Sequence, residues 1–335
     1  MLGGIHMKRA AGLLVLGSAL ASPAAAAWTL LSEGGPERHT FASALDTSRG
    51  ELLLFGGSDG TRYRSETYAY NLATGAWRQI QPVNAAPSPR RAVEGVYDPV
   101  NDRLVVFGGM GDDGFHADVW ALSLSGSPTW SELLPHGPRP SPRAAPTAVY
   151  DTRRQRMLVF GGYDPTAPGF RWNDLWALSL SGKPVWRRLS TGGIPPAPLS
   201  GHSAAYDALQ DRMLVFGGGN QVWTLSLGGR PTWTRIVPSS VGPAPRDEQA
   251  AVFDPVRQRL IVFWGYAVPD VDTYLNDTWV LSLTGIPTWT LLPLSAEQPY
   301  PRWGHGAIYD PGADRVVSHG GQLIRHETWA LPLGQ

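Results

Sequence analysis

The chain has 335 residues with 28 basic and 28 acidic side chains, so its formal net charge is zero. This balance gives no electrostatic case for binding nucleic acid or an anionic membrane surface. Because the chain contains no cysteine, disulfides, thiolate metal sites and a cysteine nucleophile are excluded. Its 39 glycines, 30 prolines and 14 tryptophans are typical of many short strands joined by tight turns.

Residues 1–27 have the pattern of a secretory signal peptide. Lys8 and Arg9 precede an apolar run over 10–20, and small residues follow as far as Ala27. The apolar run is too short to span the roughly 30 Å of hydrocarbon in a bilayer, which argues against a membrane anchor. We therefore expect export to the periplasm or the extracellular medium, and no membrane span in the mature chain.

Most of the remaining chain is built from one frame of constant length. The frame recurs at 37–57, 89–109, 142–162, 198–218, 245–265 and 301–321. Most copies open on Pro-Arg, reach an aromatic-Asp pair through small and apolar residues, turn, and end in Gly-Gly after a second apolar stretch. Aspartate and proline at the turn, between two short apolar runs, predict a strand, a tight turn and a second strand.

Two further strands follow each frame. The third strand carries Tyr68, Trp120, Trp176, Trp223, Trp279 or Trp329, and the fourth carries Trp77, Trp130, Trp186, Trp233 or Trp289. The last copy reaches Gln335 without a fourth strand, and 28–31 at the mature amino terminus has the matching pattern. We therefore predict a ring of four-stranded units whose last unit is completed by the amino-terminal strand, which leaves no open sheet edge.

The order of these signals resembles the Kelch repeat. It comprises the Pro-Arg entry, Gly201-His202-Ser203 in one copy, Leu-Val-Phe-Gly-Gly, Asn-Asp-Leu-Trp at 173–176 and the late tryptophan, and it extends from Trp28 to the carboxyl end. The resemblance implies an all-β, six-bladed propeller with four antiparallel strands in each blade. It also implies that the loops entering the first strand, and those joining the second to the third, form one mouth of a central channel.

The predicted boundaries place the signal peptide at 1–27 and the propeller at 28–335. Within the propeller, 28–36 is the outer strand of blade six, 37–86 is blade one, 87–138 blade two, 139–194 blade three, 195–241 blade four, 242–298 blade five and 299–335 the rest of blade six. The connections over 163–173 and 266–276 are long, whereas blade four has only 219–220. This difference predicts an uneven mouth with a notch above blade four, and variable loops on a rigid scaffold are where binding usually occurs.

Five arginines occupy the same position at the start of the first strand: Arg38, Arg90, Arg143, Arg246 and Arg302. Guanidinium groups that converge on one mouth suit an acidic sugar or a carboxylate-bearing peptide. The alternative is that each arginine hydrogen-bonds loop carbonyl groups as part of the repeat. Both interpretations remain open at the level of sequence.

Other candidate site residues break the repeat pattern: Arg91, Glu94, Asp247, Glu248, Trp303 and His305. Glu248 is the candidate general acid or base, because a neighbouring carboxylate raises its pKa while Arg246 opposes that shift. Trp303 and Trp264 are candidate stacking faces for a sugar. The alternative is that these side chains pack between blades or lie on a solvated rim.

Two classes of function are consistent with the sequence. The first is a monomeric, non-enzymatic binding protein that recognises a protein or a glycan through the mouth and needs no cofactor. The second follows from resemblance to a bacterial sialic-acid mutarotase of the six-bladed Kelch type, which implies Glu248 and Arg246 as catalytic residues. A copper radical oxidase of the galactose oxidase kind is excluded, because it requires a cysteine–tyrosine cross-link.

Other catalytic signatures are missing from the sequence. No Gly-Lys-Ser/Thr phosphate loop occurs, and the one Gly-x-Ser-x-Gly match, at 56–60, consists of turn glycines of the repeat. His305, His319 and His326 share blade six but lack close metal-ligand spacing, so we expect no metal site.

Overall fold

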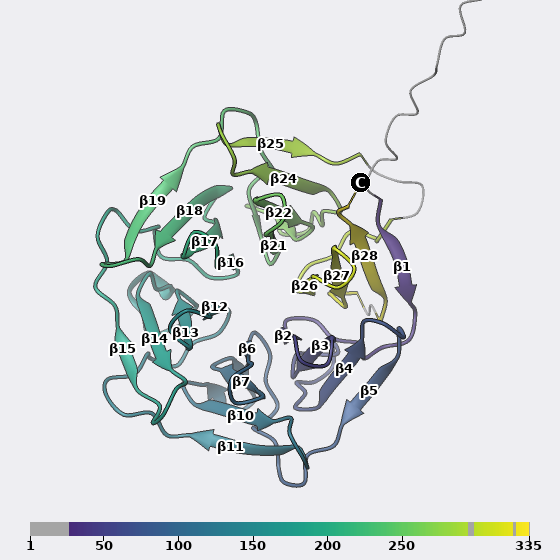
Figure 1. Cartoon of the computed structure of the whole chain (residues 1–335), viewed down its shortest axis with the longest axis vertical. Helices are drawn as coiled ribbons and strands as arrows, with labels where there is room; N and C mark the ends of the chain where they lie inside the picture. Colours follow the sequence, from purple (N-terminus) through teal and green to yellow (C-terminus); the bar gives the residue numbers. More distant parts are fainter. Residues whose placement is uncertain (1–26, 294–297, 324–325, 335) are drawn as a thin grey trace, which may run out of the picture.

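The computed structural model describes residues 27–293, 298–323 and 326–334. Six four-stranded antiparallel sheets surround a central axis as the blades of a propeller (Figure 1). The predictions of an all-β fold and of six blades are therefore confirmed. The predicted signal peptide lies, apart from Ala27, outside the described residues.

In each blade the first strand named below lies nearest the axis and the last lies at the outer edge (Figure 1). Blade one contains β2 (Ala42–Asp46), β3 (Glu51–Phe55), β4 (Thr67–Asn71) and β5 (Trp77–Ile80), and blade two contains β6 (Glu94–Asp98), β7 (Arg103–Phe107), β10 (Val119–Ser123) and β11 (Thr129–Leu133). Blade three contains β12 (Thr147–Asp151), β13 (Arg156–Phe160), β14 (Leu175–Ser179) and β15 (Trp186–Arg188), and blade four contains β16 (Ser203–Asp207), β17 (Arg212–Gly217), β18 (Gln221–Ser226) and β19 (Thr232–Ile236). Blade five contains β21 (Ala250–Asp254), β22 (Arg259–Phe263), β24 (Thr278–Ser282) and β25 (Thr288–Leu291), and blade six contains β26 (Gly306–Asp310), β27 (Arg315–His319), β28 (Thr328–Pro332) and β1 (Thr29–Ser32). Short elements in the loops are the pairs β8 (Met110–Gly111) with β9 (Gly114–Phe115) and β20 (Arg246–Asp247) with β23 (Tyr266–Ala267), and the 3-10 turn η1 (Pro168–Phe170).

The amino-terminal strand closes the ring. In blade six, β1 pairs antiparallel with β28, with Thr29 opposite Ala330 and Leu30 opposite Trp329. The buried indole of Trp28 donates a hydrogen bond to Oγ1 of Thr278 in blade five, at 3.0 Å. The predicted closure is confirmed, and it joins both ends of the chain in one sheet (Figure 1).

The late tryptophans join each blade to the one before it. Every one of them packs against the ring at the end of the preceding blade's second strand. The pairs, with the distance between ring centroids, are Phe55–Trp130 (4.9 Å), Phe107–Trp186 (5.3 Å), Phe160–Trp233 (4.8 Å), Phe216–Trp289 (5.9 Å), Phe263–Trp28 (5.0 Å) and His319–Trp77 (4.3 Å). A blade cannot bury these rings alone, so the hydrophobic core lies between blades and extends around the ring.

The face opposite the mouth carries the turns between first and second strands and is here called the turn face. Two kinds of blade boundary alternate around it. Bidentate ion pairs cross three boundaries: Arg49 with Asp102, Arg154 with Asp211 and Arg257 with Asp314. The equivalent positions at the other three boundaries hold uncharged residues, namely Asn101 with Gln155, Gln210 with Gln258 and Ala313 with Gly50. The bidentate ion pairs of the turn face therefore join the blades in pairs, whereas the other boundaries have single contacts, such as that from Arg315 to the Leu72 carbonyl.

Candidate functional site

The five arginines at the start of the first strands are buried structural residues. Each is at most 7% exposed, and each pairs with an acidic side chain that lies two positions before the third-strand aromatic residue. The pairs are Arg38–Glu66, Arg90–Asp118, Arg143–Asp174, Arg246–Asp277 and Arg302–Glu327. The last four also donate to the carbonyl of the first residue in the Gly-Gly position, as at Gly161. Their guanidinium groups are thus used within the blades, and Arg246 does not meet Glu248 as a catalytic partner.

A closed ring of backbone hydrogen bonds surrounds the inner end of the mouth. Its six members, here called the neck ring, are Thr40, Ala92, Ala145, Gly201, Glu248 and Gly304, one from each blade. Each amide donates to the carbonyl of the preceding member, with N–O distances from 2.6 to 3.2 Å, and Thr40 completes the circle by donating to Gly304. All six residues have positive φ, from 46° to 66°. The neck ring therefore fixes the backbone where ligand would enter the channel.

Glu248 is the one large side chain on the neck ring. Its φ of 55° is a conformation that costs a residue other than glycine about 1–2 kcal/mol. A Cβ at neighbouring Gly201 would lie 3.2 Å from Oε1 of Glu248, so glycine leaves room for the carboxyl group. Burial and then Asp247 raise the pKa of Glu248 to about 7, while Arg91 acts in the opposite direction. A strained residue that titrates near neutrality is typical of a functional position.

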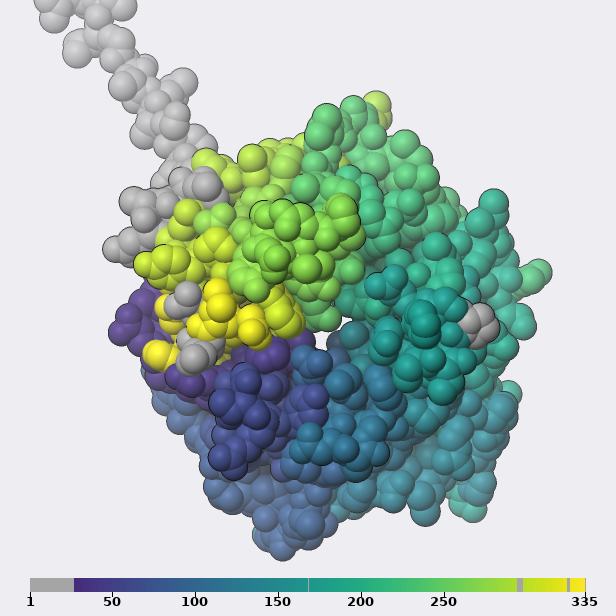
Figure 2. Space-filling view, turned by 180° about the vertical axis from the view of Figure 1, so that it is seen from behind, coloured from purple at the N-terminus to yellow at the C-terminus, as the bar shows by residue number. Residues whose placement is uncertain are grey.

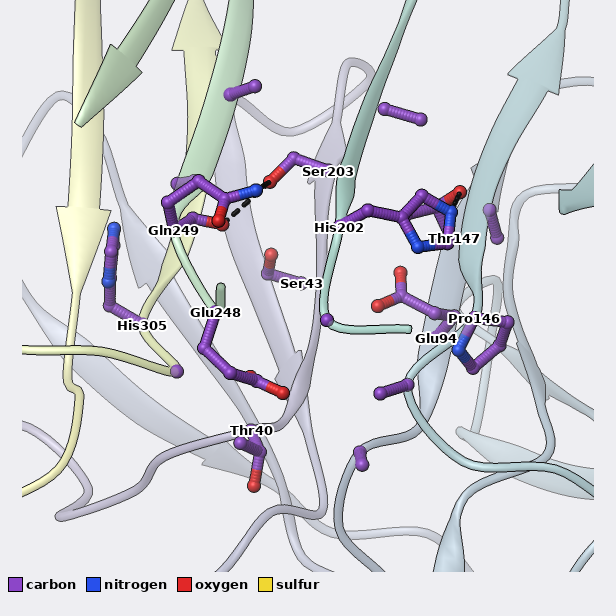
Figure 3. Close-up of a pocket in the computed structure, with 18 of the residues that line it drawn as sticks. Thr40, Ser43, Glu94, Pro146, Thr147, His202, Ser203, Glu248, Gln249 and His305 are labelled. Carbon is purple, nitrogen blue, oxygen red and sulfur yellow. Dashed lines mark hydrogen bonds between the residues drawn. The ribbon is translucent and has the colours of Figure 1, made fainter. Parts of the chain in front are cut away.

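Below the neck ring, a cavity of about 130 Å³ lies in the central channel. Glu94, at the start of β6, and Glu248 both point into it (Figure 3). Burial and then Glu248 raise the pKa of Glu94 to about 8. Two carboxyl groups with raised pKa values in one small cavity do not ionise independently, so the pair retains a proton near neutral pH.

Above the neck ring lies a second cavity of about 490 Å³, here called the vestibule. Tyr163, Tyr266, Tyr274 and Trp303 line it, and Glu248 belongs to both cavities. Figure 2 shows the hollow centre of this face, with the teal loop 163–173 and the light-green loop 266–276 standing on its rim. Both long loops line the vestibule and blade four contributes only Ser200 from its described residues, in keeping with the loop lengths.

Arg91 differs from the five buried arginines. It lies on the vestibule wall, and no ion pair to it occurs among the described residues. Its guanidinium carbon lies 5.7 Å from the centroid of the Tyr63 ring, and its buried Nε has no acceptor within the described part of the chain. Arg91 is therefore a cation that is available to a ligand.

The remaining sequence-predicted residues divide between the cavities and the core. Trp303 lines the vestibule, with its ring 5.7 Å from that of Tyr266, so it offers the expected face. Trp264 is 0% exposed and packs between Trp28 and His305, so burial removes it from the ligand-facing residues. His305 lines the channel cavity, where burial and then Arg302 hold its pKa well below 6.5.

Asp247 lies in β20, which pairs with β23 beside the vestibule. Burial raises its pKa, an effect that Arg171 opposes. Asp247 therefore acts on the site mainly through the charge that it presents to Glu248.

Sequence reasoning missed the tyrosines of the vestibule. Tyr163 and Tyr266 each come directly after the glycine that ends the repeat frame, Gly162 or Gly265. They pair with the residues that precede the neck ring: Tyr163 with Ala144, and Tyr266 with Asp247. An aromatic residue directly after this glycine could have predicted the vestibule wall, because the position faces the mouth in both blades that have long loops.

In the part of the chain that the structure describes, no group of three or more acidic or histidine side chains is arranged to hold a metal. His319 is bonded to Thr328 and Pro36, while His326 contacts Glu37, so these histidines point to separate partners. The described helical structure includes nothing of the length and apolarity needed to cross a bilayer.

The raised pKa values of Glu94 and Glu248 predict a pH dependence of stability. Both folded-state pKa values exceed the ordinary 4.5, so folding opposes ionisation and the pair lowers stability as the pH rises from about 5 to about 8. We expect the double variant Glu94→Gln/Glu248→Gln to gain about 6 kcal/mol of unfolding free energy relative to the wild type over this interval, about half of it from each residue. Urea titrations at both pH values measure the difference.

The comparison with wild type removes a competing effect. Burial lowers the pKa values of His39, His202 and His319, which makes the protein more stable as the pH rises towards 6.5. These histidines are present in both proteins, so their contribution cancels. A difference in unfolding free energy that does not change with pH would contradict the prediction.

Comparison with known proteins identifies the family. The model of the KLHDC2/KLHL20/DRC7 Kelch-repeats domain matches residues 24–133 and 125–321. Together with the six blades, this match shows that the chain belongs to the Kelch-repeat β-propeller proteins.

Three relatives are similar over about half of the chain. Human (Homo sapiens) host cell factor 1 is 28% identical over 187 residues, which is 50% of this chain and 9% of that protein. Adagio-like protein 3 of Oryza sativa subsp. japonica is 33% identical over 203 residues, 58% of this chain and 30% of the relative. Serine/threonine-protein phosphatase BSL2 of Arabidopsis thaliana is 32% identical over 169 residues, 49% of this chain and 16% of the relative. The similarity thus spans less than a third of each relative's length.

Proposed function

We propose that this Kelch propeller is an exported binding protein that recognises a glycan, or the protein that carries it, through the mouth. The vestibule is the observation on which this proposal rests. Its volume suits a small saccharide, its aromatic walls offer faces to sugar C–H groups, and Arg91 and Glu248 offer hydrogen bonds to hydroxyl groups. Export rests on the signal-peptide pattern of residues 1–27.

The loop tips support contact with a protein partner around the same opening. Phe170 and Val271 are each 57% exposed and lie on the two long loops. Exposed apolar side chains that gather on one face of a protein are common at protein interaction sites. The glycan would then occupy the vestibule, while the rim contacts the protein that carries it.

Calorimetric titration of the protein with neutral and acidic mono- and disaccharides tests the proposal. We expect at least one saccharide to bind, and Trp303→Ala to weaken that binding on the order of tenfold, because a stacking face is lost. Leu209→Ala, on the turn face, is the control and should leave affinity unchanged. If no saccharide binds, or if Trp303→Ala binds as well as the wild type, glycan recognition in the vestibule is wrong.

A second candidate, a sugar mutarotase, is favoured by the strained, near-neutral carboxyl group of Glu248. Since Arg246 is engaged by Asp277, Arg91 would supply the cation at this site. Exchange NMR on the same titrated samples would detect interconversion of anomers. The enzyme reading requires this exchange to disappear in Glu248→Gln, whereas the binding reading does not.

A further inference from the structure

In the vestibule, Arg91 lacks an ion-pair partner among the described residues. Five arginines in equivalent blade positions each have a carboxylate, but Arg91 has none among the described residues, and its Nε lacks an acceptor there. Arginine presents a planar set of donors that matches a carboxylate in bidentate geometry. The missing partner of Arg91 therefore has the chemistry of a carboxylate.

Asp272 and Glu248 also line the vestibule, but neither forms an ion pair with Arg91 among the described residues. On one side is His39, which is neutral because burial, and then Arg91, lower its pKa to about 4. On the other side is the neck ring, where Arg91 lowers the pKa of Glu248 from across the vestibule. Glu248 also faces Glu94 of β6, Asp247 of β20 and Tyr266 of β23, and Arg171 acts on the last two.

We propose that the vestibule binds an acidic saccharide whose carboxylate pairs with Arg91, and that Glu248 takes up one proton as the saccharide enters. This inference rests on the proposed function and specifies its ligand. In the free protein, Arg91 favours the ionised form of Glu248. The ligand carboxylate neutralises Arg91 and also places a second negative charge near Glu248. Both effects favour protonation, and the neutral carboxyl group then donates a hydrogen bond to the ligand. The proton comes from the solvent, and no covalent bond changes.

D-glucuronate, its methyl ester and D-glucose provide matched probes, because they differ mainly in the charge at one carbon. We expect glucuronate to bind at least about tenfold more tightly than the ester. Its affinity should fall by up to about tenfold per pH unit above about pH 7, the limit for uptake of one proton. At about pH 8, where Glu248 is mostly ionised in the free protein, calorimetry in two buffers with different ionisation enthalpies should measure uptake of about one proton.

Two variants separate the roles of the two residues. Arg91→Gln should lose on the order of a hundredfold in glucuronate affinity but less than about tenfold in glucose affinity, because glutamine removes the charge and keeps a hydrogen-bond donor; the retained glucose binding also shows that the vestibule is folded. Glu248→Gln should retain the preference for glucuronate but remove the dependence on buffer and pH. Arg187→Gln, an exposed arginine on the outer strand β15, is the control for loss of one positive charge.

The possible results have different meanings. Equal affinities for glucuronate and its ester, or an unchanged preference in Arg91→Gln, would overturn the assignment of Arg91 and leave glycan binding intact. Binding enthalpies that do not depend on the buffer would overturn the role of Glu248. If neither the charged nor the neutral sugars bind, the proposed function fails together with this inference.

Discussion

Deletion of residues 28–32 is expected to lower the free energy of unfolding by at least about 5 kcal/mol. The deletion exposes the edge of β28 and removes the buried Trp28 with its packing against Phe263 and Trp264. The ring would then also lose the covalent link between its first and last blades. Urea unfolding followed by tryptophan fluorescence measures the change.

A peptide of residues 27–36 provides a test of the mechanism. Added in excess, it should restore much of the lost stability, because it can pair with β28 as the natural strand does. Thr29→Ala in the full chain is the control for β1, since Thr29 is exposed and its backbone pairing is retained. An unfolding midpoint unaffected by the deletion would show that closure contributes little.

The second large effect is expected for Arg143→Ala, with a loss of about 3–5 kcal/mol in unfolding free energy. Arg143 is 1% exposed and donates to both carboxylate oxygens of Asp174, at 2.6 and 3.2 Å, and to the carbonyl of Gly161. Among the described residues, truncation leaves Asp174 buried with the indole of Trp176 as its one remaining side-chain donor. The cost therefore comes mainly from an uncompensated charge.

The double variant Arg143→Met/Asp174→Leu separates that cost from lost packing. Because it removes both charges and keeps most of the volume, it should recover most of the stability lost in Arg143→Ala. Thermal unfolding of the three proteins gives the comparison. If Arg143→Ala is within about 1 kcal/mol of the wild type, the pair is not the structural link that its geometry indicates.

The sequence carried enough information for the fold because the repeat makes each local signal appear several times. The missing fourth strand before Gln335 and the matching pattern at Trp28 predicted the closure that β1 and β28 form. The pairing of the arginines also left a signal that sequence reasoning overlooked. Blade four, which has Leu199 in place of arginine, has Gln221 in place of the acidic residue as well. The two positions change together because either charge alone would be buried without a partner.

The candidate site was less accessible from the sequence, because its geometry depends on contacts between blades. Glu248 was recognised as a break in the pattern, but its left-handed backbone conformation follows from a hydrogen-bond ring to which every blade contributes one residue. Arg91 and Arg90 are adjacent and chemically identical, yet one faces the vestibule and the other is bonded to Asp118. Only the alternation of side chains at the start of the strand separates them.

The alternating boundaries of the turn face give the molecule a mechanical unit larger than the blade. Arg49, Arg154 and Arg257 each fasten one blade to the next, so the ring consists of three stiff wedges of two blades. Between wedges, amides or the small residues Ala313 and Gly50 replace the ion pair, and the arginine contacts are single bonds to carbonyl groups, as from Arg315 to Leu72. Since the neck ring ties all six blades together at the mouth, we expect any opening of the propeller to be larger at the turn face than around Glu248.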